Sequence, residues 1–220
     1  MQNLNSAAAC PYHGHVITQS APPSENGLIS LNQISDLLPP DLVIHKTELL
    51  KFKSWVLEFL CKPNSELGRK GAVCPFTKKA YDLNFFWVTV QNSWQISPEN
   101  LISTFYRYKN IFKSLAPNAE GENIFKTISI LFPFIDKNQF KIIEEVQESL
   151  KPAFVKEGIM IGQFYPGCSQ PGLNNSAFRP LNAPLPLLAI RNMVESDLPF
   201  LVGNPEFEKS YHTRFQKENV

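Results

Sequence analysis

The sequence predicts a single α/β domain built on one four-stranded mixed sheet, in the element order βαβαββα, with flanking helices and an N-terminal helical segment. Apolar runs rich in aromatic and β-branched residues alternate with segments whose apolar residues recur every three or four positions. The 220 residues suffice for one buried core, and the 18 prolines are too many for an all-helical protein. A thioredoxin-like or ferredoxin-like layer fits this order.

Four apolar runs are expected to pair in the sheet. They are "NFFWVTV" (84–90), "KTISILFPF" (126–134), "GIMIGQFY" (158–165) and "PLLAIRNM" (186–193). The first is almost unbroken in aromatic and β-branched residues, which indicates a strand buried on both faces beside parallel neighbours. Because crossover connections are right-handed, we expect the first three strands to be parallel or mixed.

Helical spacing of apolar residues defines the segments between these strands. We expect helices over residues 46–60, from Pro98 to near Pro117, over about 137–151 and within 196–216, with a small helix and a bend in 28–44. The second helix has the clearest start, because Ser97 and Pro98 supply an N-cap and a first-turn proline.

Residues 1–27 are rich in Ser, Ala, Asn, Gln and Pro and have no periodicity, so we predict a disordered tail before a domain over 28–220. Within that tail, Cys10, His13 and His15 have a spacing that suits a soft or borderline metal ion. A structural metal site needs ligands supported by packed neighbours. We therefore expect the tail and not a metal site.

Composition excludes several classes of function. The formal net charge of +1 argues against a general nucleic-acid binder. The sequence has no apolar run of about 20 residues and no secretory pattern at its start, so we expect a cytoplasmic protein without a membrane partner. The four cysteines are scattered and are expected to be reduced. The expected partner is a small-molecule substrate, and an oligomer stays open.

Common catalytic motifs are absent from the sequence. It has no Gly-rich dinucleotide turn, phosphate loop, paired-histidine zinc helix or serine elbow. A thioredoxin-like redox enzyme carries two cysteines separated by two other residues, whereas Cys74-Pro75-Phe76-Thr77 contains a single cysteine. Dithiol exchange is therefore not expected.

The stretch "EGIMIGQFYPGCSQPGL" (157–173) is the first candidate site. Gly162 lies inside a predicted strand, where a missing side chain often marks the close approach of a ligand or of another backbone. Tyr165 stands at the strand end, and Gly167 and Gly172 let the following loop turn sharply.

Further candidates flank the strands. In "LGRKGAVCPF", Arg69 and Cys74 either sit at the mouth of a pocket or are structural, with Cys74 buried. Arg179 and Arg191 border apolar strand sequence, so a partly buried guanidinium needs a carboxylate, a carbonyl or an anionic ligand. Asp197 is a candidate internal partner for either arginine.

Three segments resemble an uncharacterised bacterial domain family found near specialised-metabolite genes. They are "LGRKGAVCPF", "IMIGQFYPG" and "FRPLNAPLPLLAIRNMVESDLPFL". The resemblance covers about residues 45–215 and supplies no known reaction. Members of this family tend to have His where this chain has Asn192.

The layout and the stretch "YPGCS" (165–169) also resemble the YqcI/YcgG family. That family includes haem-dependent oxygenases that hydroxylate a guanidine nitrogen of arginine-like substrates. It has His where this chain has Tyr165, so the resemblance leaves the axial ligand of a haem iron open. The candidates for that ligand are Tyr165, Cys74, Cys168 and the N-terminal histidines.

The first hypothesis for function is thus a monooxygenase-like, haem-dependent enzyme acting on a small amino acid or amine in a biosynthetic pathway. Arg179 or Arg191 would hold a carboxylate or a haem propionate, and Phe164 and Phe178 would form an apolar wall. The second is a cofactor-free biosynthetic enzyme that uses Tyr165 or Cys74 as acid, base or nucleophile. The third is a binding or accessory protein without catalysis.

Overall fold

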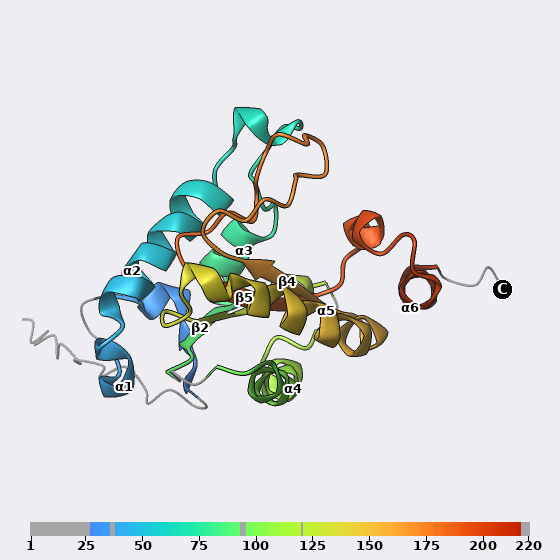
Figure 1. Cartoon of the computed structure of the whole chain (residues 1–220). Coiled ribbons are helices and arrows are strands. Elements are labelled where there is room, and N and C mark those ends of the chain that lie inside the picture. Colours follow the sequence, from blue (N-terminus) through green and yellow to red (C-terminus); the bar gives the residue numbers. More distant parts are fainter. Residues whose placement is uncertain (1–26, 36–37, 93–95, 120, 217–220) are drawn as a thin grey trace, which may run out of the picture.

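The centre of the molecule is one mixed β-sheet (Figure 1). The structure is a computed structural model that describes residues 27–35, 38–92, 96–119 and 121–216. Within these residues the sheet has the strand order β1-β2-β3-β5-β4. The strands are β1 (Ile29–Ser30), β2 (Phe86–Val90), β3 (Thr127–Leu131), β4 (Ile159–Phe164) and β5 (Leu187–Asn192). Strands β2 and β3 pair in parallel, and β5 pairs antiparallel with both β3 and β4.

All four predicted strands are confirmed, and the first three run in one direction. The predicted number was wrong, because β1 adds a fifth strand that pairs antiparallel with β2, Ile29 lying opposite Val88. Two residues are too few to show the alternation of a strand, so the pattern alone could not identify β1. The short helices η2 (Leu31–Gln33) and α1 (Pro40–Val43) follow it, as the sequence predicts for this segment.

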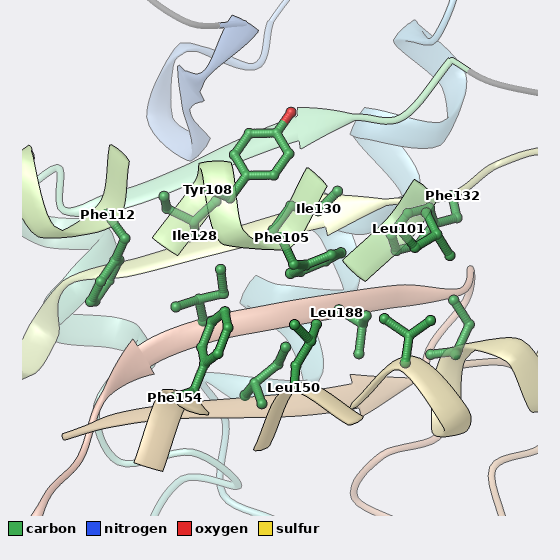
Figure 2. Packing of buried hydrophobic residues seen from close by; sticks show 14 of the residues in the cluster. Leu101, Phe105, Tyr108, Phe112, Ile128, Ile130, Phe132, Leu150, Phe154 and Leu188 are labelled. Atoms are coloured by element: carbon green, nitrogen blue, oxygen red, sulfur yellow. The ribbon is translucent and has the colours of Figure 1, made fainter. Parts of the chain in front are cut away.

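Helices α4 (Pro98–Ser114) and α5 (Phe140–Lys156) cover one face of the sheet. Helix α4 begins where predicted, since the Ser97 side chain accepts a hydrogen bond from the backbone N–H of Asn100. Figure 2 shows the apolar side chains of these helices packed against those of the strands. Fully buried members of this core include Phe105, Ile128, Ile130, Leu150, Phe154 and Leu188.

Helices α2 (Lys46–Trp55) and α3 (Thr77–Asp82) cover the opposite face. Alternation along β2 directs Phe86 to this face, where its ring lies 6.0 Å from that of Phe52. A π-helical turn, η3 (Val56–Leu60), continues α2. The sheet is therefore the middle of three layers.

Helix α6 (Pro205–Phe215) packs against α5 and is preceded by the 3-10 segment η7 (Glu195–Phe200). The other short segments are η4 (Ser65–Leu67), η5 (Asn123–Phe125) and η6 (Lys137–Gln139). From β2 onward the strands and α-helices follow the predicted order βαβαββα, which differs from the βαββαβ order of a ferredoxin-like layer. In the part of the chain that the structure describes, every helix is too short or too polar to cross a membrane.

The long connection between β4 and β5, residues 165–186, packs against the loop that precedes α3 (Figure 1). The side-chain amide of Asn175 donates a hydrogen bond of 2.7 Å to the carbonyl of Glu66. Phe178 is buried against Leu67 and Val73. This contact holds together two loops that are far apart in the sequence and that carry most of the predicted site residues.

A buried lysine joins the two helices of the first face. Lys109 of α4 is buried and donates a hydrogen bond to Glu157, which also accepts one of 2.7 Å from Lys113. Hydrogen bonds from Lys109 and Lys113 lower the pKa of Glu157 below its usual range. The folded state thus stabilises the charged carboxylate.

Replacing Glu157 with Gln tests this link. Because Lys109 would stay buried without a charged partner, we expect the free energy of unfolding at pH 7 to fall by about 1–3 kcal/mol. A depressed folded-state pKa gives stability that is present above the unfolded pKa and lost at lower pH. The difference between wild type and variant in urea titrations should therefore shrink as pH falls below about 4.

The matched control is Glu145→Gln, which removes an exposed partner 4.0 Å from Lys141. It should cost less than about 0.5 kcal/mol at any pH. Equal losses for the two variants would show that Lys109 does not depend on Glu157.

Candidate functional site

The sheet separates the residues that the sequence singles out. Side chains alternate along β4, so Ile161 and Tyr165 lie with the core under α5, whereas Phe164 lies with the core under α2. Gly162 lies two residues before Phe164 and therefore faces the same side of the sheet, the α2 side. Tyr165 and Gly162 therefore do not share one site.

Tyr165 stands directly after the carboxyl end of β4, which is where α/β sheets commonly bind ligands. Its hydroxyl donates a hydrogen bond of 2.5 Å to Oε1 of Glu144 on α5. Its ring lies 5.2 Å from the ring of Phe140, and its carbonyl accepts a hydrogen bond from the backbone N–H of Ala183. Helix, strand and loop together fix the position of the phenol.

Cys168 completes this cluster. The backbone N–H of Cys168 donates to the carbonyl of Tyr165 at 3.1 Å, which closes a turn in which Gly167 has the positive φ of 77° that favours glycine. The Cys168 side chain is buried beside this turn, and its proximity acts on the pKa of Tyr165.

The environment keeps Tyr165 protonated. Burial, followed by the hydrogen bond to Glu144 and the proximity of Cys168, raises the pKa of Tyr165 well above its ordinary value. The phenol and the carboxylate form a hydrogen-bonded pair, with the buried Cys168 beside them. Such a donor–acceptor pair can pass a proton from one member to the other.

Sequence reasoning missed Glu144. It is one of several acidic residues on α5, and the helical pattern that predicts this helix identifies its buried positions. Glu144 is partly exposed and becomes distinctive only through its contact with Tyr165. The crossover from β3 to β4 supplies that contact, because it lays α5 along the sheet beside the carboxyl end of β4.

Arg191 pairs with Asp197, which the sequence analysis names as its candidate partner. Its guanidinium makes hydrogen bonds of 2.7 and 2.6 Å to the two carboxylate oxygens of Asp197, which is buried and also accepts one from the backbone N–H of Val194. Burial acts to lower the pKa of Arg191, but the hydrogen bonds to Asp197 outweigh it and raise the pKa. This pair is a structural contact between β5 and η7.

Cys74 lies on the α2 side with Arg191 and is half-buried, so it is not the fully buried cysteine of the structural alternative. The charged form of its thiol contributes to the raised pKa of Arg191.

Gly162 lies opposite Ala189 of β5, and a Cβ atom there would meet the Phe164 ring at an ordinary 3.5 Å. The protein's own atoms therefore do not require glycine at this position.

Arg69 and Arg179 stabilise their own loops. The Arg69 guanidinium donates to the carbonyls of Lys70 and Val73 at 3.0 and 3.1 Å. The Arg179 guanidinium donates to the carbonyl of Ser176 at 2.5 Å. The described contacts of the two arginines give neither of them a role at Tyr165.

Phe164 and Phe178 end a row of aromatic rings on the α2 side. Trp55 lies 5.9 Å from Phe164 and 6.0 Å from Phe59, which lies 6.0 Å from Phe178. The two phenylalanines thus belong to one apolar wall, on the face of the sheet opposite the Tyr165 cluster.

Metal ligands do not gather in the part of the chain that the structure describes. There, no group of three or more His, Cys, Asp or Glu side chains is arranged to hold a metal ion. Cys10, His13 and His15 lie outside the described residues. Asn192, where the resembling family tends to have His, is buried and donates a hydrogen bond of 2.7 Å to the carbonyl of Asn123.

The fold and the cluster define an α/β protein with a tyrosine hydrogen-bonded to a glutamate just after the carboxyl end of a sheet strand. Residues 49–220 match the model of a family described as a domain of unknown function, DUF6875, and the chain belongs to this family. No curated protein and no solved structure matches the chain. The family description names no reaction, so function rests on the site itself.

Replacing Asp197 with Asn tests the structural role of the Arg191 pair. The substitution leaves the partly exposed Arg191 guanidinium without its charged partner, so the free energy of unfolding should fall by about 1.5–3 kcal/mol in urea titrations. Asp82→Asn is the matched control, because its partner Lys78 lies on the surface and such an exposed pair should contribute far less. A loss no larger than that of the control would contradict the structural role.

Proposed function

We propose that the chain is a cofactor-free enzyme that moves a proton to or from a small molecule at Tyr165. The observation that carries the proposal is the hydrogen bond from the Tyr165 hydroxyl to Glu144 after the carboxyl end of β4. A fixed phenol bonded to a carboxylate is a suitable acid–base pair, because the carboxylate can take the phenolic proton as the phenolic oxygen accepts one from the substrate.

The direction of the hydrogen bonds determines the step. The Tyr165 proton is directed at Glu144, so the phenolic oxygen faces a substrate as an acceptor. A proton leaves the substrate for the Tyr165 oxygen while the phenolic proton moves to Glu144, and the reverse transfer restores both groups. The raised pKa of Tyr165 disfavours a free tyrosinate, which favours moving the two protons together.

Haem-dependent oxygenation is the other hypothesis from the sequence, and the named residues do not fit it together. A Tyr axial ligand binds iron as tyrosinate, whereas the contacts of Tyr165 raise the pKa of its hydroxyl. The phenylalanine wall and Arg191 lie across the sheet from this hydroxyl. We therefore derive no step through haem, and we propose biosynthesis of a small molecule without it.

Proton transfer can be measured before the natural substrate is known. In deuterated water, an enzyme of this kind exchanges acidic C–H protons of suitable compounds, which NMR detects in a panel of small 2-oxo acids, ketones and amino acids. For the compounds that the wild type exchanges, Tyr165→Phe should lower the exchange rate by at least about 100-fold, because general acid–base catalysis contributes about 10²–10⁴. Glu144→Gln should give a similar loss.

The control is Tyr106→Phe, which removes a hydroxyl from the exposed side of α4 and should leave the rate unchanged. No exchange by the wild type, or an equal rate in Tyr165→Phe, would contradict the proposal. Protein from haem-supplied cells should show no Soret band. A band that is lost in Tyr165→Phe would support the haem hypothesis instead.

A further inference from the structure

Two cysteines that are thirteen positions apart in the sequence meet where the loop before α3 closes on itself. Pro63 and Ala72 form an antiparallel bridge, and the backbone N–H of Val73 donates to the carbonyl of Lys62 at 3.0 Å. The next backbone N–H, that of Cys74, donates to the carbonyl of Leu60 at 2.9 Å. Cys61 therefore lies between Leu60 and Lys62, whose carbonyls accept these two hydrogen bonds from the backbone of Cys74 and Val73.

The side chains of the two cysteines interact. After burial, the charge of Cys74 is the largest cause that raises the pKa of the Cys61 thiol to about 11. A disulfide needs Cβ atoms about 3.5–4.5 Å apart, and the two cysteines lie on backbone segments that are hydrogen-bonded to each other. A small movement therefore suffices to join them.

Both thiols are free and accessible. Cys61 and Cys74 are half-buried, whereas Cys168 is fully buried. Cys74, the thiol assigned below to the first attack, has the cationic Arg191 as an electrostatic neighbour. Positive neighbours and partial exposure are the conditions under which cysteines react with oxidants.

We propose that Cys61 and Cys74 are a redox-active pair that hydrogen peroxide converts to an intramolecular disulfide. The Cys74 thiolate attacks one peroxide oxygen, the O–O bond breaks, and the released hydroxide takes a proton to leave as water. The resulting sulfenic acid then reacts with the Cys61 thiol, which forms the S–S bond and releases a second water. Two thiols are thus oxidised by two electrons as one peroxide is reduced to two waters.

We assign the first attack to Cys74 because the raised pKa of Cys61 keeps that thiol protonated. The pair does not depend on the proposed function at Tyr165. The loop that it would close carries Glu66, whose carbonyl binds Asn175 of the long connection, so oxidation acts on a segment in contact with the loop that begins at Tyr165.

The test uses the reduced, full-length wild type. It is treated with increasing hydrogen peroxide, remaining thiols are blocked with N-ethylmaleimide, and the digest is analysed by mass spectrometry. We expect one cross-linked peptide pair joining Cys61 to Cys74, about 2 Da lighter than the reduced pair and lost after treatment with dithiothreitol. Cys168→Ala, a variant at the buried thiol, should give the same cross-link.

The variants Cys61→Ser and Cys74→Ser, checked for folding by circular dichroism, should lack it. Cys61→Ser should instead accumulate a sulfenic acid at Cys74, detectable by dimedone labelling. Full alkylation of both wild-type thiols after peroxide treatment would overturn the proposal. So would a disulfide that joins either residue to Cys10 or to Cys168.

Discussion

The antiparallel insertion of β5 between β3 and β4 is the constraint on which the rest of the structure depends. Strand β5 pairs with β3 over Leu187–Arg191 and with β4 over Leu187–Asn192. Because β5 is antiparallel to β4, it begins at the end of the sheet where β4 finishes. The connection over residues 165–186 therefore leaves and rejoins the sheet at this same end. Loops longer than about 12–15 residues are often functional.

This topology explains how the acid–base cluster is positioned. The right-handed crossover from β3 to β4 lays α5 beside the sheet and brings Glu144 to the end of β4. The return of the chain to β5 then binds the backbone of Tyr165 to Leu181 and Ala183. A phenol held from the helix, the strand and the loop needs little reorganisation before it transfers a proton, which is what a catalytic group requires.

The sequence predicts the four long strands and the helices because each has a strong periodic pattern, and the strand residues Phe86, Ile130, Ile161 and Leu188 are buried. It could not predict β1, which is two residues long, or the place of β5 between β3 and β4, because pairing order leaves no local pattern. Arg191 and Asp197 are six residues apart in the sequence, so their pairing could be predicted from it.

The candidate site was predicted in part. Tyr165 stood out as a polar aromatic residue at a strand end, but its partner Glu144 is separated by the remainder of α5 and all of β4, so their contact depends on tertiary packing. Cys61 and Cys74 also meet through the path of a loop and not through spacing. Gly162 shows the opposite error, since a pattern typical of a close approach falls where the protein's own atoms leave room for a side chain.

The most direct test of the account is the protonation state of Tyr165 in the folded protein. In protein labelled with ¹³C at the tyrosine Cζ atoms, the Tyr165 resonance is identified by its absence from the spectrum of Tyr165→Phe. The account predicts that this resonance keeps the shift of a protonated phenol above pH of about 10, where an unperturbed tyrosine titrates, and that Glu144→Gln moves its titration. Titration of Tyr165 at or below the ordinary pKa, unchanged by Glu144→Gln, would contradict it.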